Sequence, residues 1–113
     1  MIALPNDIEI EKSLLASCFI DQQFNAWDTL RPEYFYHTRH QNIYKTLLEL
    51  RKRSEPVEAT LVAAELKADN ESRKAIFDLL DSPISTDPKA YAAKIKNYWQ
   101  LREFFALSNA VNK

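Results

Sequence analysis

The sequence predicts an all-α fold, a compact bundle of five to six short helices followed by a long C-terminal helix. Three observations predict it: apolar residues recur every three or four positions, Pro, Asn, Asp and Ser residues separate the periodic segments, and none of the 113 residues is glycine. Glycine supplies the positive φ angles that tight hairpins favour, so its absence disfavours a sheet. The length fits one domain, with a globular head over residues 1–86 and a long helix over residues 87–113.

The first predicted helix falls between residues 4 and 21. Asn6 is expected to cap it, and Glu9, three residues later, completes a capping box. Its apolar face is predicted to hold Ile8, Leu14, Leu15, Cys18 and Phe19. A short second helix is expected over residues 22–30, and Pro32 can open a further helical turn because the first helical position needs no amide.

The clearest periodicity lies over residues 38–53 and predicts a helix that ends in basic residues, which the helix dipole favours. The inner face of this helix is predicted to hold His40, Ile43, Tyr44, Leu47, Leu48 and Arg51. Two compact helices are expected over residues 59–68 and 69–80, the second capped by Asp69 or Asn70. Their inward side chains are predicted to be Leu61, Val62, Glu65, Leu66, Ile76, Leu79 and Leu80.

The last helix is predicted to begin with Asp87 as N-cap and Pro88 at the first helical position. It carries a band of large apolar side chains that is broad for the last helix of a small domain. We therefore expect part of the band to contact a following helix or a second subunit. The residues expected in this contact are Tyr91, Ile95, Tyr98, Trp99 and Phe105.

The segment Pro32–His40, PEYFYHTRH, concentrates three aromatic residues and two histidines and admits three interpretations. A metal site would need more ligands than His37 and His40, which are three residues apart and lie outside any HExxH motif. Tyr34, Phe35 and Tyr36 are the residues that would stack on single-stranded nucleic acid, but such platforms usually lie on sheets or in basic grooves. The helix junction favours the third interpretation, in which these aromatic residues close one end of the core and His40 is structural.

Charge and composition disfavour several classes of protein. No apolar run approaches the roughly 18 residues that a membrane span needs, and the acidic N-terminal stretch does not resemble a secretory signal. One cysteine cannot form an internal disulfide, so we expect a cytoplasmic protein. Without glycine the chain lacks a Walker A loop, so we expect no nucleotide-hydrolysing site in it. The carboxylates are scattered over helix surfaces, so we expect no other catalytic site, and we expect no cofactor or metal in this chain.

Binding to DNA through this chain is also disfavoured. Four successive segments, residues 1–30, 31–53, 54–86 and 87–113, carry net charges of −4, +4, −4 and +3, and the whole chain is nearly neutral. A duplex-binding domain is usually clearly basic. The two helices predicted between residues 59 and 80 could form a helix-turn-helix, but Glu71 and Asp78 on the second would be repelled by phosphates.

Four stretches of the chain are similar, in order, to the N-terminal domain of DnaB-type replicative DNA helicases. They are LPNDIEIEKSLLASCFID, LRPEYFYHTRHQNIYKTLLEL, EPVEATLVAAELK and DPKAYAAKIKNYWQLREF. The second resembles the most recognisable segment of that family, and its matching residues are Glu33, Phe35, His40, Ile43 and Tyr44. The chain departs from the family at Ala16 and in the segment 68–77, where the family usually has glycines.

The resemblance implies a helical collar domain that dimerises through a C-terminal helical hairpin within a hexameric ring. It also implies contact with a DnaG-type primase or a helicase loader, weak or absent DNA contact by this domain, and ATP and Mg²⁺ only in a downstream motor. Lys113 falls about where the first hairpin helix would end, so we expect a fragment of a longer helicase. The alternatives are a stand-alone replication adaptor, such as a loader or primase-binding protein, and, less favoured, a helix-turn-helix regulator.

Overall fold

The computed structural model describes residues 5–20, 29–83 and 87–111, and within these ranges every regular element is a helix. The all-α prediction is therefore confirmed. The elements are α1 (Ile8–Ile20), the 3₁₀ turn η2 (Pro32–Tyr34), α2 (Thr38–Lys52), α3 (Ala59–Glu65), α4 (Asn70–Leu79) and α5 (Pro88–Val111). The short helix expected over residues 22–30 lies, except for its last two positions, outside the described residues.

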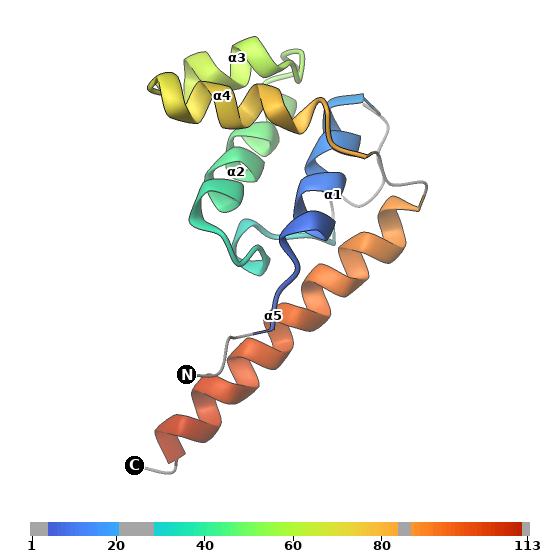
Figure 1. Ribbon diagram of the computed structural model, residues 1–113, viewed down its shortest axis with the longest axis vertical. Helices are drawn as coiled ribbons and strands as arrows, with labels where there is room; N and C mark the ends of the chain where they lie inside the picture. The colour runs from blue at the N-terminus through green and yellow to red at the C-terminus, as the bar shows by residue number, and fades with distance from the viewer. Residues whose placement is uncertain (1–4, 21–28, 84–86, 112–113) are drawn as a thin grey trace.

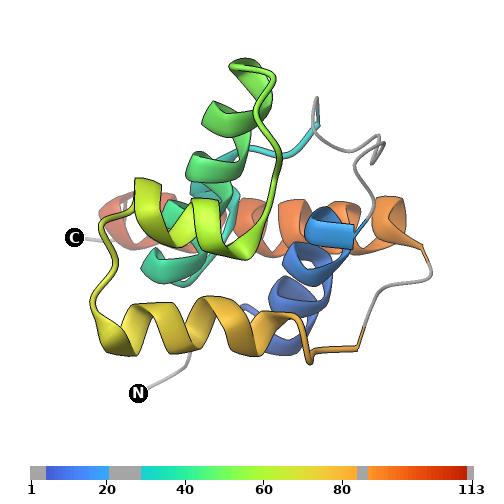
Figure 2. The same cartoon turned by 90° about the horizontal axis from the view of Figure 1, so that it is seen from above.

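Helix α1 lies at the centre of the molecule. Helices α2, α4 and α5 pack against it from different sides, and α3 covers α2 and α4 (Figures 1 and 2). Residues 13–19 of α1 are all buried, which explains why that stretch carries no charged side chain and contains Cys18. A helix enclosed on several sides needs small or apolar residues all round rather than on one face.

The two halves of α5 differ in their packing. Figure 1 shows α5 crossing below the other helices, with its C-terminal half extending past them. In its N-terminal half, Ala92 and Ile95 are buried against α1, and Trp99 is partly buried against η2. The molecule is accordingly elongated, at 46 × 30 × 26 Å. The extension leaves the end of α5 without a packing partner among the described residues.

Aspartates cap three of the helices. The Asp7 carboxylate accepts hydrogen bonds from the amides two and three residues later, at 3.0 and 3.2 Å. The prediction of Asn6 as the cap is wrong by one position, because α1 begins at Ile8. Asp69 accepts from the Ser72 amide at 2.8 Å, and Asp87 accepts from the Ala90 amide at 3.2 Å, so both of these caps are confirmed.

Two helices end in the left-handed conformation that glycine usually supplies. Ser54 and Lys67, which directly follow the C-caps of α2 and α3, have φ angles of 59° and 50°. In each case the next amide bonds the carbonyl five residues back, at 2.9 Å for Glu55 and 3.0 Å for Ala68. These are Schellman motifs built without glycine. The chain therefore turns sharply twice at a conformational cost that glycine would avoid.

Several side chains that the periodicity placed inward are exposed. In α2 the predicted inner face is covered except for Arg51, which is exposed, and Thr46 and Leu50 are buried in addition. Ile8 lies in the first turn of α1, beyond the point where the other helices enclose it. The other side chains that were predicted to face inward but are exposed lie on the outer sides of α3 and α4, which form the edge of the bundle. They are Leu61, Glu65 and Leu80.

Candidate functional site

The aromatic segment at residues 32–40 belongs mainly to the core. Tyr34 is 7% exposed and Phe35 is fully buried. The Tyr34 ring lies 4.5 Å from the Trp99 ring, and the Phe35 ring lies 5.2 Å from the Tyr44 ring, measured between centroids. The rings of Tyr34 and Phe35 are therefore packed against other aromatic rings and offer no platform for a nucleobase. The structural interpretation of this segment fits the packing.

A buried carboxylate explains the histidine in this segment. Glu11 of α1 is 2% exposed, and its Oε1 atom lies 2.8 Å from Nδ1 of His40, which is 6% exposed. The other oxygen, Oε2, accepts a hydrogen bond from the Tyr36 amide at 2.8 Å. Both carboxylate oxygens are thus used to join α1 to α2 and to the segment before it. This satisfaction of a buried charge is a structural role.

The signal for Glu11 was present in the sequence. Positions 8, 11, 15 and 18 keep the three- and four-residue spacing of one helix face, so Glu11 interrupts an apolar stripe. An acid on such a stripe needs a buried partner. Within the ranges that the structure describes, no group of three His, Cys, Asp or Glu side chains is placed to hold a metal ion.

A second polar contact fixes α5 against the rest of the molecule. The Arg102 guanidinium donates to the carbonyl oxygens of Pro5, at 2.9 Å, and Tyr34, at 2.7 Å. Its Cζ atom also lies 5.2 Å from the centroid of the Tyr36 ring. Burial lowers the pKa of the Arg102 guanidinium, but an arginine stays protonated in proteins. Arg102 therefore ties three parts of the chain together at the point where α5 leaves the bundle.

From Leu101 onward, α5 presents a set of exposed apolar side chains, which we call the α5 stripe. Leu101 and Phe105 are four residues apart and lie one above the other, and Phe104 and Leu107 flank them. Phe104 and Leu107 are the most exposed, at 62% and 65%. Large apolar patches on a soluble protein mark sites of interaction. The α5 stripe consists of Leu101, Phe104, Phe105 and Leu107.

Comparison with known proteins decides the family. The family described as "DnaB-like helicase N terminal domain" matches residues 3–97.

The chain belongs to this family.

Relatives of this DnaB-like domain include two replicative DNA helicases. DnaB from Geobacillus stearothermophilus is 29% identical over 115 aligned residues, covering 95% of this chain and 25% of that protein. DnaB from Mycobacterium leprae (strain TN) is 39% identical over 64 residues, covering 55% of this chain and 11% of that protein. The DnaB-like domain therefore spans about a quarter or less of the length of these relatives.

Two solved structures have the same fold. The N-terminal domain of DnaB helicase from Mycobacterium tuberculosis superposes with a TM-score of 0.88 and 28% identity, covering 96% of this chain and 84% of that one. The N-terminal domain of DnaB from Helicobacter pylori, studied together with its interactions with primase, gives a TM-score of 0.77, covering 92% of this chain and 87% of that one. Its identity is 19%, so this second match supports the fold alone.

The residues that resembled the family signature occupy defined places in this DnaB-like domain. Phe35, His40, Ile43 and Tyr44 are buried and meet at the junction of η2 and α2. Glu33 is exposed and lies 3.8 Å from Arg31 across a surface ion pair. Four of the five are thus core residues, which explains their recognisable spacing by packing.

The residues expected at a dimer contact divide into two groups. Ile95 is 2% exposed and belongs to the core, and Tyr91 and Trp99 are partly buried against it. Because their surface is largely used inside the domain, these three have little to offer a second copy. Tyr98 is partly exposed, and Phe105, a member of the α5 stripe, is 44% exposed, so these two remain available for a contact.

Among the helices within the described ranges, none is both long enough and apolar enough to span a membrane.

Proposed function

We propose that this DnaB-like domain is the assembly and partner-docking part of a replicative DNA helicase. The observation that carries the proposal is the α5 stripe, which leaves large apolar side chains exposed on a domain of a helicase family. Two copies that pair through this stripe bury the same patch twice, as a symmetric dimer requires. The pairs then serve as the repeating unit of a hexameric ring. Because replication takes place there, we also propose the cytoplasm as the compartment.

The catalytic part of such a helicase lies outside this chain. No glycine is available for a phosphate-binding loop, so ATP and Mg²⁺ are proposed to bind a separate motor domain downstream. The contribution of the DnaB-like domain is then binding and not catalysis, with little or no direct contact to DNA.

A primase of the DnaG type or a helicase loader is the partner that we propose for docking. The support is indirect: the Helicobacter pylori domain with this fold was studied with primase. In this chain the docking surface has to lie outside the core residues of α1 and η2, which the domain itself covers. Titration of the labelled chain with the helicase-binding domain of a DnaG-type primase tests this part of the proposal.

Sedimentation equilibrium of the 113-residue chain tests the assembly role. We expect a monomer–dimer equilibrium in the wild type and a monomer in the double variant Phe104→Glu, Leu107→Glu. Full burial of an apolar side chain of this size stabilises the dimer by roughly 1.5–3 kcal/mol. Burial of a carboxylate in its place is unfavourable, so the substitution should destabilise the dimer. These two positions contact none of the core residues, so the circular dichroism spectrum should not change.

The matched control is the single variant Ala106→Glu, compared with the single variant Phe104→Glu. Ala106 is exposed and lies two residues after Phe104, which places it on the opposite side of α5. Both variants add one negative charge, so Phe104→Glu should weaken the dimer whereas Ala106→Glu should dimerise like the wild type. A wild type that stays monomeric at millimolar concentration, or equal loss of dimers in these two single variants, contradicts the proposed assembly surface.

A further inference from the structure

A hollow separates α4 from α2 on the side of the molecule away from α5. Helix α4 packs against α1 and α3, and its residues Ala75 and Leu79 line the hollow together with Ile43 of α2. The hollow has a volume of about 340 Å³, within the range of ligand-binding clefts. Its lining residues are Ile8, Lys12, His37, Arg39, His40, Ile43, Ala75, Asp78, Leu79 and Ser82.

A second hollow of about 300 Å³ continues the first along α4. Arg39 and Ile43 line both, so together the two hollows form one groove between α2 and α4. We call this the α2–α4 groove. Its far end is lined by residues of α2, α4 and the turn between α3 and α4, among them Leu66, Ala68 and Ile76. A groove of this length suits an extended or helical peptide better than a small molecule.

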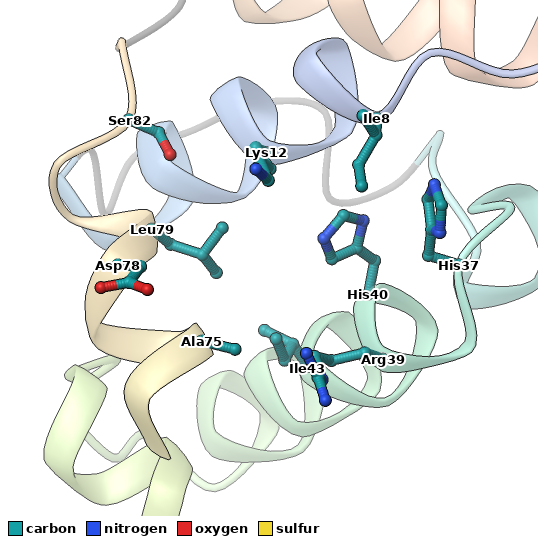
Figure 3. Close-up of a pocket in the computed structure, with 10 residues that line it drawn as sticks. All are labelled: Ile8, Lys12, His37, Arg39, His40, Ile43, Ala75, Asp78, Leu79 and Ser82. Atoms are coloured by element: carbon teal, nitrogen blue, oxygen red, sulfur yellow. The ribbon is translucent and has the colours of Figure 1, made fainter. Parts of the chain in front are cut away.

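Seven of the fifteen residues that line the α2–α4 groove are apolar. Ile43 forms part of the floor and is 1% exposed. Figure 3 shows Ile8 of α1, Ile43 of α2, and Ala75 and Leu79 of α4 around the same hollow. A leucine-like side chain that enters here would contact apolar groups from three helices. That arrangement is typical of grooves that accept the apolar face of a peptide.

The rim of the groove is cationic. Lys12 and Arg39 lie on opposite sides of the hollow, on α1 and α2 (Figure 3). Arg39 is exposed and forms no ion pair within 4 Å among the described residues, while Lys12 has only a 3.7 Å contact with exposed Glu9. Asp78 is the one acid among the residues that line the first hollow. Exposed cations beside an apolar floor favour carboxylates as ligands, because a carboxylate can form a charge-assisted hydrogen bond with each of them.

An unsatisfied polar atom lies at the same end of the groove. The Nε2 atom of His37 is buried and has no hydrogen-bond partner among the described residues. His37 lines the first hollow, next to His40, whose Nδ1 atom is already bonded to Glu11. A buried nitrogen without a partner is costly, and a polar group of a bound ligand would satisfy it.

We propose that the α2–α4 groove binds an acidic, leucine-containing segment of a partner protein. The leucine enters the hollow, and carboxylates flanking it pair with Lys12 and Arg39. The inference rests on the proposed docking function and gives it a surface and a ligand chemistry. Nucleic acid is less suitable, because Lys12 and Arg39 are the only lysine and arginine among the residues that line the groove, whereas a phosphate chain presents a negative charge at every nucleotide.

Nuclear magnetic resonance titration of the ¹⁵N-labelled chain tests the groove. The probe is an amidated 12-residue peptide with leucines at helical spacing and four glutamates, and the matched probe has glutamine at those four positions. We expect the glutamate peptide to shift amide resonances on the facing sides of α1, α2 and α4, and to bind at least tenfold more tightly than the glutamine peptide. Equal binding of both peptides, or shifts confined to α5, overturns the proposal.

Three variants give the test its specificity. Arg39→Glu reverses an exposed charge on the rim and should weaken binding of the glutamate peptide at least tenfold, and Ala75→Leu should do the same by filling the hollow. Lys45→Glu makes the same charge change on an exposed, off-groove position of α2, so it should leave the affinity unchanged. Circular dichroism establishes that all three are folded. Equal effects of Arg39→Glu and Lys45→Glu would overturn the proposal, since they would indicate nonspecific attraction.

Two further measurements separate this inference from the proposed function. An oligothymidylate 12-mer that displaces the glutamate peptide would overturn the choice of a protein segment. Primase binding and dimerisation that persist in Arg39→Glu, without any binding of the glutamate peptide to the wild type, would overturn the groove and leave the proposed function intact. Peptide binding that persists in the monomeric Phe104→Glu, Leu107→Glu variant would support a groove independent of assembly.

Discussion

The imidazole of His40 and the carboxylate of Glu11 meet 2.8 Å apart in the interior, although 29 residues separate them in the chain. Both side chains are almost fully buried. The second carboxylate oxygen is occupied by the Tyr36 amide, so the group has a complete set of protein partners. The pair fixes how α1, η2 and α2 meet.

Replacement of His40 by alanine should lower the free energy of unfolding by about 1–3 kcal/mol, because the Glu11 carboxylate then loses a buried partner. Urea denaturation measures the change. The double variant Glu11→Ala, His40→Ala should cost less than the sum of the two single variants, since each single variant leaves one group unpaired. Zinc should not alter the melting temperature of the wild type, and a zinc-dependent rise would contradict the structural role of His40.

Replacement of Arg102 by methionine should loosen α5. The variant loses two hydrogen bonds from a charged donor, and each is worth roughly 1.5–3 kcal/mol at most when it is shielded from water. Amide hydrogen exchange should accelerate in the second half of α5 and around Tyr34 more than in α2. Lys96→Met is the matched control, since Lys96 is exposed on the same helix. Equal acceleration in both variants would show that Arg102 does not fasten the helix.

Replacement of Asp69 by alanine should lower stability at neutral pH, and the loss should depend on pH. The hydrogen bond from the Ser72 amide lowers the pKa of the Asp69 carboxyl. A carboxyl whose pKa is lower in the folded state stabilises the protein above its unfolded pKa, about 3.9, and this stabilisation disappears as the pH falls through the folded pKa. Thermal unfolding of wild type and variant should therefore converge below about pH 4.

The variant Asp69→Asn serves as the control for this prediction. Its amide oxygen can still accept the hydrogen bond from Ser72, but it carries no charge. Its stability relative to Asp69→Ala should change less with pH. A constant gap between wild type and Asp69→Ala from pH 7 down to pH 3 would refute the assignment of the cap.

Replacement of Lys67 by glycine should stabilise the protein by about 0.5–1 kcal/mol. The left-handed conformation costs a residue with a side chain roughly 1–2 kcal/mol, and glycine avoids this cost. Part of the gain is offset because glycine has more backbone freedom to lose when the chain folds. Ser54→Gly should act in the same direction. Lys74→Gly, in the middle of α4, should instead destabilise the protein by about 1 kcal/mol. Denaturant titration of the three variants checks the order, and destabilisation by Lys67→Gly would contradict the φ angle described above.

The sequence was sufficient for the fold class because helical periodicity, caps and breakers all agree. Asp69 and Asp87 cap helices as predicted, and α5 begins at Pro88. The first cap was misplaced by one residue because Asn6 and Asp7 are both good caps and only the backbone selects between them. Arg51 was assigned to the inner face of α2 in place of Leu50 because the two residues are adjacent, and periodicity alone cannot decide which of them the neighbouring helices cover.

The candidate sites were harder to predict, because they depend on how helices meet. Ile95 and Phe105 both belong to the broad apolar band predicted on the last helix, but Ile95 is covered by α1 whereas Phe105 is 44% exposed. The α2–α4 groove combines residues from three helices, so the spacing of residues within any one helix does not predict it. Glu11 was the exception, since an acid on an apolar stripe predicts a buried partner before that partner is identified.

The central position of α1 also determines when the domain can fold during synthesis. Helix α1 is synthesised before its neighbour α5, and Arg102 of α5 bonds a carbonyl 97 residues earlier in the chain. At typical rates of about 5–20 residues per second, several seconds pass between the synthesis of α1 and that of α5. The side of α1 that α5 covers therefore stays exposed to solvent in the nascent chain during that interval.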